Sequence, residues 1–99
     1  MEVQKGDIVL SRNGRDKGKA LFVLEVSEDY LLLVDGKSRT VEHPKRKKTK
    51  HCMFLDRESS RITPKLAAGE KVFNNEVRKA LATFRAGNAD LEQTDGEGN

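Results

Sequence analysis

Two apolar segments constrain the fold of this chain more than any other feature. Residues 20–24 read ALFVL and residues 31–34 read LLLV, so apolar side chains occupy successive positions in both. Successive side chains of a β-strand point to opposite faces of the sheet, and both faces of these two strands therefore need cover. A small barrel alone would leave one face in water, so we expect another segment of the chain to pack across it.

Turn signals divide the first part of the chain into five short strands. Alternating apolar residues predict strands at 7–12 and 19–26, and a third strand, 31–34, follows a polar turn. Asp35-Gly36 predicts the next turn, because this pair tolerates positive φ. The two remaining predicted strands are residues 39–43 and 51–55. Five short strands joined by basic loops are typical of a small barrel, so the predicted fold class is mainly β.

Beyond the predicted strands the pattern changes to helical spacing. Thr63-Pro64 predicts the start of a short helix, with a capping hydroxyl before a proline in the first helical position, and Gly69 predicts its end. A second helix is predicted over residues 74–86, with Asn74 as its N-cap and a glycine after its last residue.

These patterns predict one domain with three parts. Residues 1–56 form the barrel, residues 57–86 form a helical extension packed on it, and residues 87–99 form a disordered acidic tail. The tail has one large apolar residue and four acidic residues, so burial cannot offset the entropy lost on ordering. The extension would cover the apolar strands with a stripe of large side chains, namely Phe73, Val77, Leu81 and Phe84.

The distribution of charge favours a polyanionic partner. The net charge is +3, but residues 1–65 carry 15 Lys or Arg against 10 Asp or Glu, whereas residues 66–99 carry 4 against 6. Basic charge gathered in one part of a domain is typical of nucleic-acid binding, and an anionic membrane is the alternative. No apolar run is long enough to cross a bilayer, and the first residues lack the apolar core of a signal peptide. We therefore expect a cytoplasmic protein.

Composition gives little support for catalysis. Only 35% of the 99 residues are hydrophobic and none is tryptophan, so little apolar material is left to line a deep pocket. His43, His51 and Cys52 lack a fourth ligand at suitable spacing for a metal, and a Cys-His nucleophile would need an orienting group. Cys52 is the single cysteine, so no disulfide can form within the chain. We expect no enzyme activity, no metal and no cofactor.

The most informative short segment is NGRDKGK, residues 13–19. Gly14 and Gly18 predict a rigid turn: Gly14 permits a conformation barred to other residues, and Gly18 removes a Cβ from the junction with the next strand. A rigid turn loses less entropy on docking, so it can present cations to phosphate groups efficiently. The predicted phosphate contacts of this turn are Arg15, Lys17 and Lys19.

A second basic segment, residues 45–50, is also a candidate for RNA contact. Its like charges repel, and we expect it to stay extended until a phosphate backbone neutralises it. Its cations are Lys45, Arg46, Lys47, Lys48 and Lys50, and Arg12 and Arg39 are added from neighbouring segments. A solvated surface, a membrane or an acidic protein remains an alternative explanation. Tyr30 and Phe54 could stack on bases, but both occupy apolar strands and are expected in the core.

Residues 6–26, GDIVLSRNGRDKGKALFVLEV, resemble the KOW motif of ribosomal and transcription proteins. Residues 34–55 resemble the rest of the barrel in the large-subunit ribosomal proteins numbered fourteen-e, six-e and twenty-seven-e. Residues 69–84 are similar to the end of short bacterial single-KOW proteins, so the likeness covers about residues 4–86.

The resemblance implies an SH3-like barrel that binds large-subunit ribosomal RNA, as a ribosomal or ribosome-associated protein. Other ribosomal proteins are then further partners, and the free chain is expected to be a monomer. The alternative function is a protein-interaction barrel in transcription or translation complexes, because some transcription elongation factors also carry KOW domains.

Overall fold

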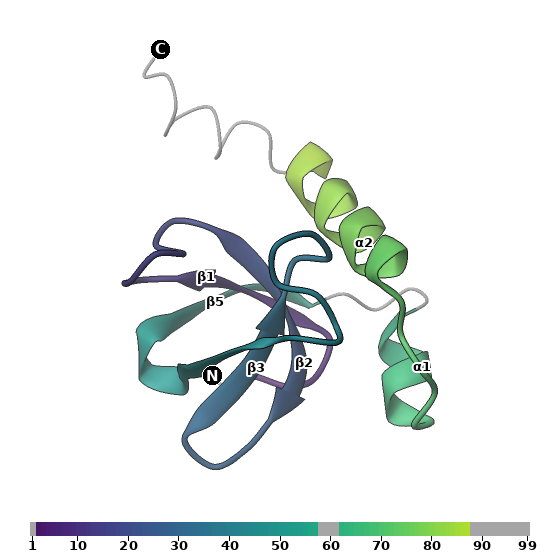
Figure 1. Ribbon diagram of the computed structural model, residues 1–99, viewed down its shortest axis with the longest axis horizontal. Coiled ribbons are helices and arrows are strands. Elements are labelled where there is room, and N and C mark those ends of the chain that lie inside the picture. The colour runs from purple at the N-terminus through teal and green to yellow at the C-terminus, as the bar shows by residue number, and fades with distance from the viewer. Residues whose placement is uncertain (1, 58–61, 88–99) are drawn as a thin grey trace.

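The computed structural model describes residues 2–57 and 62–87, and its main element is one open sheet of five antiparallel strands (Figure 1). The strands follow the order β4-β3-β2-β1-β5, so β4 and β5 are the edges. They are β1 (Asp7–Ser11), β2 (Ala20–Val26), β3 (Tyr30–Val34), β4 (Lys45–Lys48) and β5 (Cys52–Arg57), with a 3₁₀ turn, η1 (Thr49–His51), before β5. The predicted mainly β class is confirmed.

The fourth strand differs from the prediction. Residues 39–43 do not form a strand, because the Asp35 carboxylate closes a turn by accepting hydrogen bonds from the backbone N–H groups of Lys37 and Arg39, both at 2.8 Å. The chain returns to β3 only at Lys45, which lies opposite Leu33. The basic segment that was expected to be a loop therefore contributes β4 itself.

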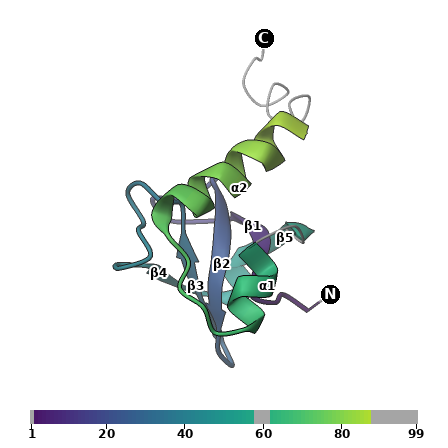
Figure 2. The same ribbon diagram turned by 90° about the vertical axis from the view of Figure 1, so that its right-hand side faces the viewer.

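The two faces of the sheet belong to two separate apolar clusters. One cluster contains Val9, Leu21, Val23, Leu31 and Leu33, all fully buried on the inner face. The opposite face contributes Ile8, Phe22 and Val34 to a second cluster, which is completed by the helices. Both helices, α1 (Ile62–Ala67) and α2 (Asn74–Gly87), lie on this side of the sheet (Figure 2). The expected cover for the apolar strands is therefore present.

The helix ends differ in detail from the prediction. Helix α1 begins at Ile62, one residue before the predicted capping threonine, and its last residue is Ala67; Gly69, the predicted stop, lies in the turn that follows, with a φ angle of 74°. Helix α2 is capped by Phe73: its carbonyl accepts hydrogen bonds from the N–H groups of Glu76 and Val77, and its own N–H donates to Glu76 Oε1 at 2.9 Å. Asn74 is therefore not the N-cap.

The side chain of Asn74 has another role, in joining α2 to the segment after β3. Asn74 Oδ1 accepts a hydrogen bond from the Val41 N–H, and its amide donates to Glu42, both at 2.9 Å. The predicted stripe is also shifted, because Phe73 is 49% exposed. The buried residues of α2 are Val77, Ala80, Leu81 and Phe84.

The predicted tail lies almost entirely outside the described residues. The boundary between the sheet and the helical extension is likewise not fixed, because residues 58–61 are outside the described ranges.

Candidate nucleic-acid interface

The turn between β1 and β2 has the constrained backbone that its glycines predict. Gly14 and Gly18 have φ angles of 80° and 85°. The Gly18 N–H donates to the Ser11 carbonyl at 2.9 Å, and the Ser11 N–H donates to the Lys19 carbonyl at 3.0 Å. An added Cβ at Gly18 would meet no atom within 4 Å, so its backbone angle and not crowding requires glycine there.

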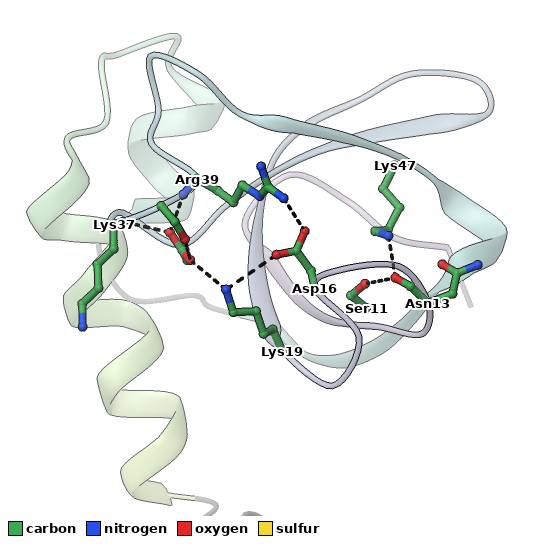
Figure 3. Close-up of polar contacts among 9 residues, drawn as sticks. Ser11, Asn13, Asp16, Lys19, Lys37, Arg39 and Lys47 are labelled. Atoms are coloured by element: carbon green, nitrogen blue, oxygen red, sulfur yellow. Dashed lines mark hydrogen bonds and ion pairs between the residues drawn. The ribbon is translucent and has the colours of Figure 1, made fainter.

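Lys47 connects this turn to β4 and is not part of the exposed charge. Its side chain lies opposite Leu31 and is 9% exposed, and its Nζ donates to the Asn13 carbonyl at 2.9 Å (Figure 3). The Ser11 hydroxyl donates to the same carbonyl at 3.1 Å. Lys47 was predicted to contact phosphate, but the structure places it inside, where it holds the turn against the strand.

Asp16, in the middle of the turn, binds two more of the predicted cations. Arg39 Nη2 donates to Asp16 Oδ2 at 3.0 Å, and Lys19 Nζ lies 3.6 Å from Asp16 Oδ1 and 3.8 Å from Asp35 Oδ2 (Figure 3). Burial alone would raise the pKa of Asp16, but hydrogen bonding and charge from Arg39, with the charge of Lys19, lower it overall. Arg39 and Lys19 thus have carboxylate partners within the chain, although the Lys19 side chain is still 48% exposed.

Seven of the predicted cations form no ion pair within residues 2–57 and 62–87. Six are exposed and Lys45 is half-buried. Arg46 lies over the ring of Tyr30. Tyr30 was predicted to lie in the core, but the structure shows it half-buried. We call these seven residues the basic surface: Arg12, Arg15, Lys17, Lys45, Arg46, Lys48 and Lys50.

The fold brings the two basic segments together. The Arg12 N–H donates to the His51 carbonyl at 2.9 Å, and Lys47 joins β4 to Asn13 at the same distance. The Thr49 N–H donates to the Asp29 carbonyl at 2.9 Å, so the acidic turn between β2 and β3 lies beside the C-terminal end of β4. The first two contacts join residues at least 34 positions apart in the chain, so the two basic segments are held next to each other, and an acidic turn lies beside the second.

The sequence reasoning missed the internal counter-ions. Asp16 is 3% exposed and lies inside the most basic turn, which is the signal that could have identified it as a partner of Lys19 and Arg39. It also missed a second buried carboxylate, Asp7, which accepts a hydrogen bond from Arg57 Nε at 2.9 Å.

Within the described ranges, no three His, Cys, Asp or Glu side chains are placed to share a metal ion. Burial raises the pKa of the Cys52 thiol despite the nearby Lys47 charge, which disfavours the reactive thiolate. None of the helices in residues 62–87 combines the length and hydrophobicity needed to cross a bilayer.

Comparison of the chain with protein-family models and with curated proteins finds no match in either. The KOW resemblance therefore stays a prediction.

Proposed function

We propose that this protein is a non-enzymatic RNA-binding module whose basic surface contacts the phosphates of structured RNA. The observation that carries the proposal is the pair of contacts at Asn13 and His51, which hold two separate basic segments side by side. These contacts bring together two segments that carry seven cations without carboxylate partners in the described ranges. A phosphate backbone is the partner that neutralises such a surface most effectively.

The chemistry of the turn suits phosphate groups. The Arg15 guanidinium can form paired hydrogen bonds to one phosphate, whereas Lys17 acts as a point charge. Because the turn is fixed by its glycines, Lys47 and Asp16, little conformational entropy is lost when it docks. Contacts of this kind recognise the shape of folded RNA and not its sequence.

The strand arrangement supports the finer assignment to an SH3-like KOW barrel. Strands β1 to β4 follow one another across the sheet, and β5 returns beside β1 after the 3₁₀ turn η1. Together with the motif at residues 6–26, this supports large-subunit ribosomal RNA as the target, and a cytoplasmic, ribosome-associated protein.

The test is the salt dependence of binding to a structured fragment of large-subunit ribosomal RNA. In the double variant Arg15→Gln and Lys17→Gln, we expect weaker binding and a slope of log K against log salt that is smaller by about 0.7–0.9 per lost phosphate contact. The matched control is Lys71→Gln with Lys79→Gln, which removes the same charge from the helical part and should leave the slope close to wild type.

An unchanged slope in a folded Arg15 and Lys17 variant would refute the assignment of this turn. Association in cells is tested by sedimenting a native lysate and crosslinking the large-subunit fraction. Capture of protein partners that resists both nuclease and high salt would instead favour the protein-interaction barrel.

A further inference from the structure

The outer face of β3 and β4 carries a stacked pair of side chains that phosphate binding alone does not explain. Arg46 Cζ lies 3.9 Å from the centroid of the Tyr30 ring. In the register of the two strands, Tyr30 is opposite Lys48 and Leu32 is opposite Arg46. Arg46 therefore reaches diagonally across one face of the sheet to the ring, and Lys48 lies beside the pair.

This end of the face is not covered by the helices. Val34, at the other end of β3, is fully buried in the cluster that the helices complete, whereas Tyr30 is half-buried and Arg46 and Lys48 are exposed. Arg46 forms no ion pair with any carboxylate in the described ranges. The guanidinium carbon thus lies in cation–π contact with the ring while the Arg46 side chain stays exposed, so the side away from the ring is accessible from solvent.

We propose that this pair is a stacking platform for an unpaired nucleobase of the bound RNA. The base would lie on the side of the Arg46 guanidinium that faces away from Tyr30, while Lys48, on the same face of the sheet, contacts a flanking phosphate. Arginine planes and aromatic rings stack on unpaired bases, and any base can be accepted because each has a π-face. The inference deepens the proposed function and rests on it, because it makes loops, bulges or single strands the preferred part of the RNA.

The amino-acid composition supplies a direct reporter. The chain has one tyrosine and no tryptophan, so its intrinsic fluorescence comes from Tyr30 alone. The probes are a short oligoadenylate and an abasic ribose-phosphate oligomer of the same length and charge. We expect the oligoadenylate to bind about tenfold more tightly and to change the tyrosine emission, with free tyrosine amide correcting for absorbance by the bases.

Two variants separate stacking from charge. Arg46→Lys keeps the charge but removes the planar face, so it should abolish the preference for oligoadenylate and leave the salt slope unchanged. Tyr30→Phe keeps the ring and should retain the preference, measured with labelled oligomers, whereas Tyr30→Leu should lose it.

The outcomes distinguish the two proposals. Equal binding of both oligomers by the wild-type chain, or a preference that survives Arg46→Lys, would overturn the platform and leave phosphate binding intact. If the chain shows salt-dependent binding to none of the three probes, namely the two oligomers and structured RNA, the proposed function is overturned together with the platform.

Discussion

Lys47 differs from the other lysines of its segment because its ammonium group is directed inward. In the variant Lys47→Met the aliphatic stem is kept and the hydrogen bond to Asn13 is lost. We expect RNA affinity to fall about two- to tenfold because the turn is less ordered, and the salt slope to stay unchanged because no phosphate contact is lost. Lys48→Gln is the comparison, since it should lower the slope. A lower slope in Lys47→Met would show that Lys47 itself contacts phosphate.

Asp16 should make the stability of the fold depend on pH. Its pKa is lowered from 3.8 in the folded chain, so its ion pairs stabilise the fold above about pH 4, and this contribution is lost as the pH falls through the lower folded pKa. Asp16→Asn should reduce the free energy of unfolding by about 1–3 kcal/mol at neutral pH. Urea unfolding of both chains at neutral and acidic pH should show the difference shrinking below about pH 4. The control is Asp29→Asn, in the exposed acidic turn, which should change the free energy of unfolding little. A loss of stability in Asp16→Asn that is the same at neutral and acidic pH would contradict the stabilising role of the Asp16 ion pairs.

The sequence predicted the types of the site residues better than their partners. Gly14, Gly18 and the neighbouring cations were identified correctly as a constrained basic turn. Arg39 was expected to contact RNA but binds Asp16, 23 positions earlier in the chain. This pairing depends on how the fold brings the turn between β1 and β2 next to the turn after β3. The spacing of residues within either turn does not predict it.

At the scale of the structural elements, the turn after β3 lies directly against the start of α2. Gly36 has a φ angle of 80°, and a Cβ added there would lie 2.6 Å from the Asn74 carbonyl oxygen and 2.7 Å from Arg78 Cγ. The Arg78 guanidinium also donates to the Gly36 carbonyl at 2.6 Å. This turn therefore fixes the start of α2 against the sheet.

Replacement of Gly36 by alanine should accordingly be more damaging than a replacement that only strains the backbone. Gly18 has a similar φ angle, but a Cβ added there would meet no atom within 4 Å. Gly18→Ala should therefore cost about 1–2 kcal/mol of stability, from backbone strain alone. Gly36→Ala should cost about 1–3 kcal/mol more, because the backbone of α2 must move. Denaturant unfolding of the two variants measures the difference, and equal losses would show that the contact with α2 does not matter.

Strand β4 shows why one element could not be predicted from its sequence. KRKK has no alternation of apolar and polar residues, and clustered charge predicts a loop. The segment is nevertheless a strand because it is an edge: Arg46 and Lys48 are exposed on the outer face, whereas Lys45 and Lys47 share the inner face, where Lys45 is half-buried and Lys47 is buried. The apolar strands β1, β2 and β3 were predicted to within about one residue at each end.

At the scale of the whole molecule, the helices complete the core on one face of the sheet. Leu81 is 1% exposed and packs in the cluster of Ile8 and Phe22, so Leu81→Ala should reduce the free energy of unfolding by about 2–5 kcal/mol. Phe73→Ala, at a position that spacing assigned to the same apolar stripe, should cost less than about 1 kcal/mol because its ring is exposed. Thermal or urea unfolding tests the pair, and a loss for Leu81→Ala as small as that expected for Phe73→Ala would show that α2 does not stabilise the sheet in solution.

The need for this cover followed from residues 20–24 and 31–34, whose apolar side chains point to both faces. The prediction that a helical segment supplies it agrees with the structure. The exact stripe could not be predicted, because Phe73 lies at the correct helical spacing but before the helix begins, where Lys65 and Lys71 lie over its ring.

The position of β4 at the margin of the sheet has a consequence for solubility. An unpaired strand margin can recruit the same margin of another copy, and repeated recruitment leads to fibres. Two such copies meeting along β4 would set lysines and arginines against one another, so their repulsion protects the free protein from self-assembly. A polyanion that neutralises β4 would remove this repulsion. Self-assembly along β4 would then be least favoured on a polyanion long enough to keep bound copies apart.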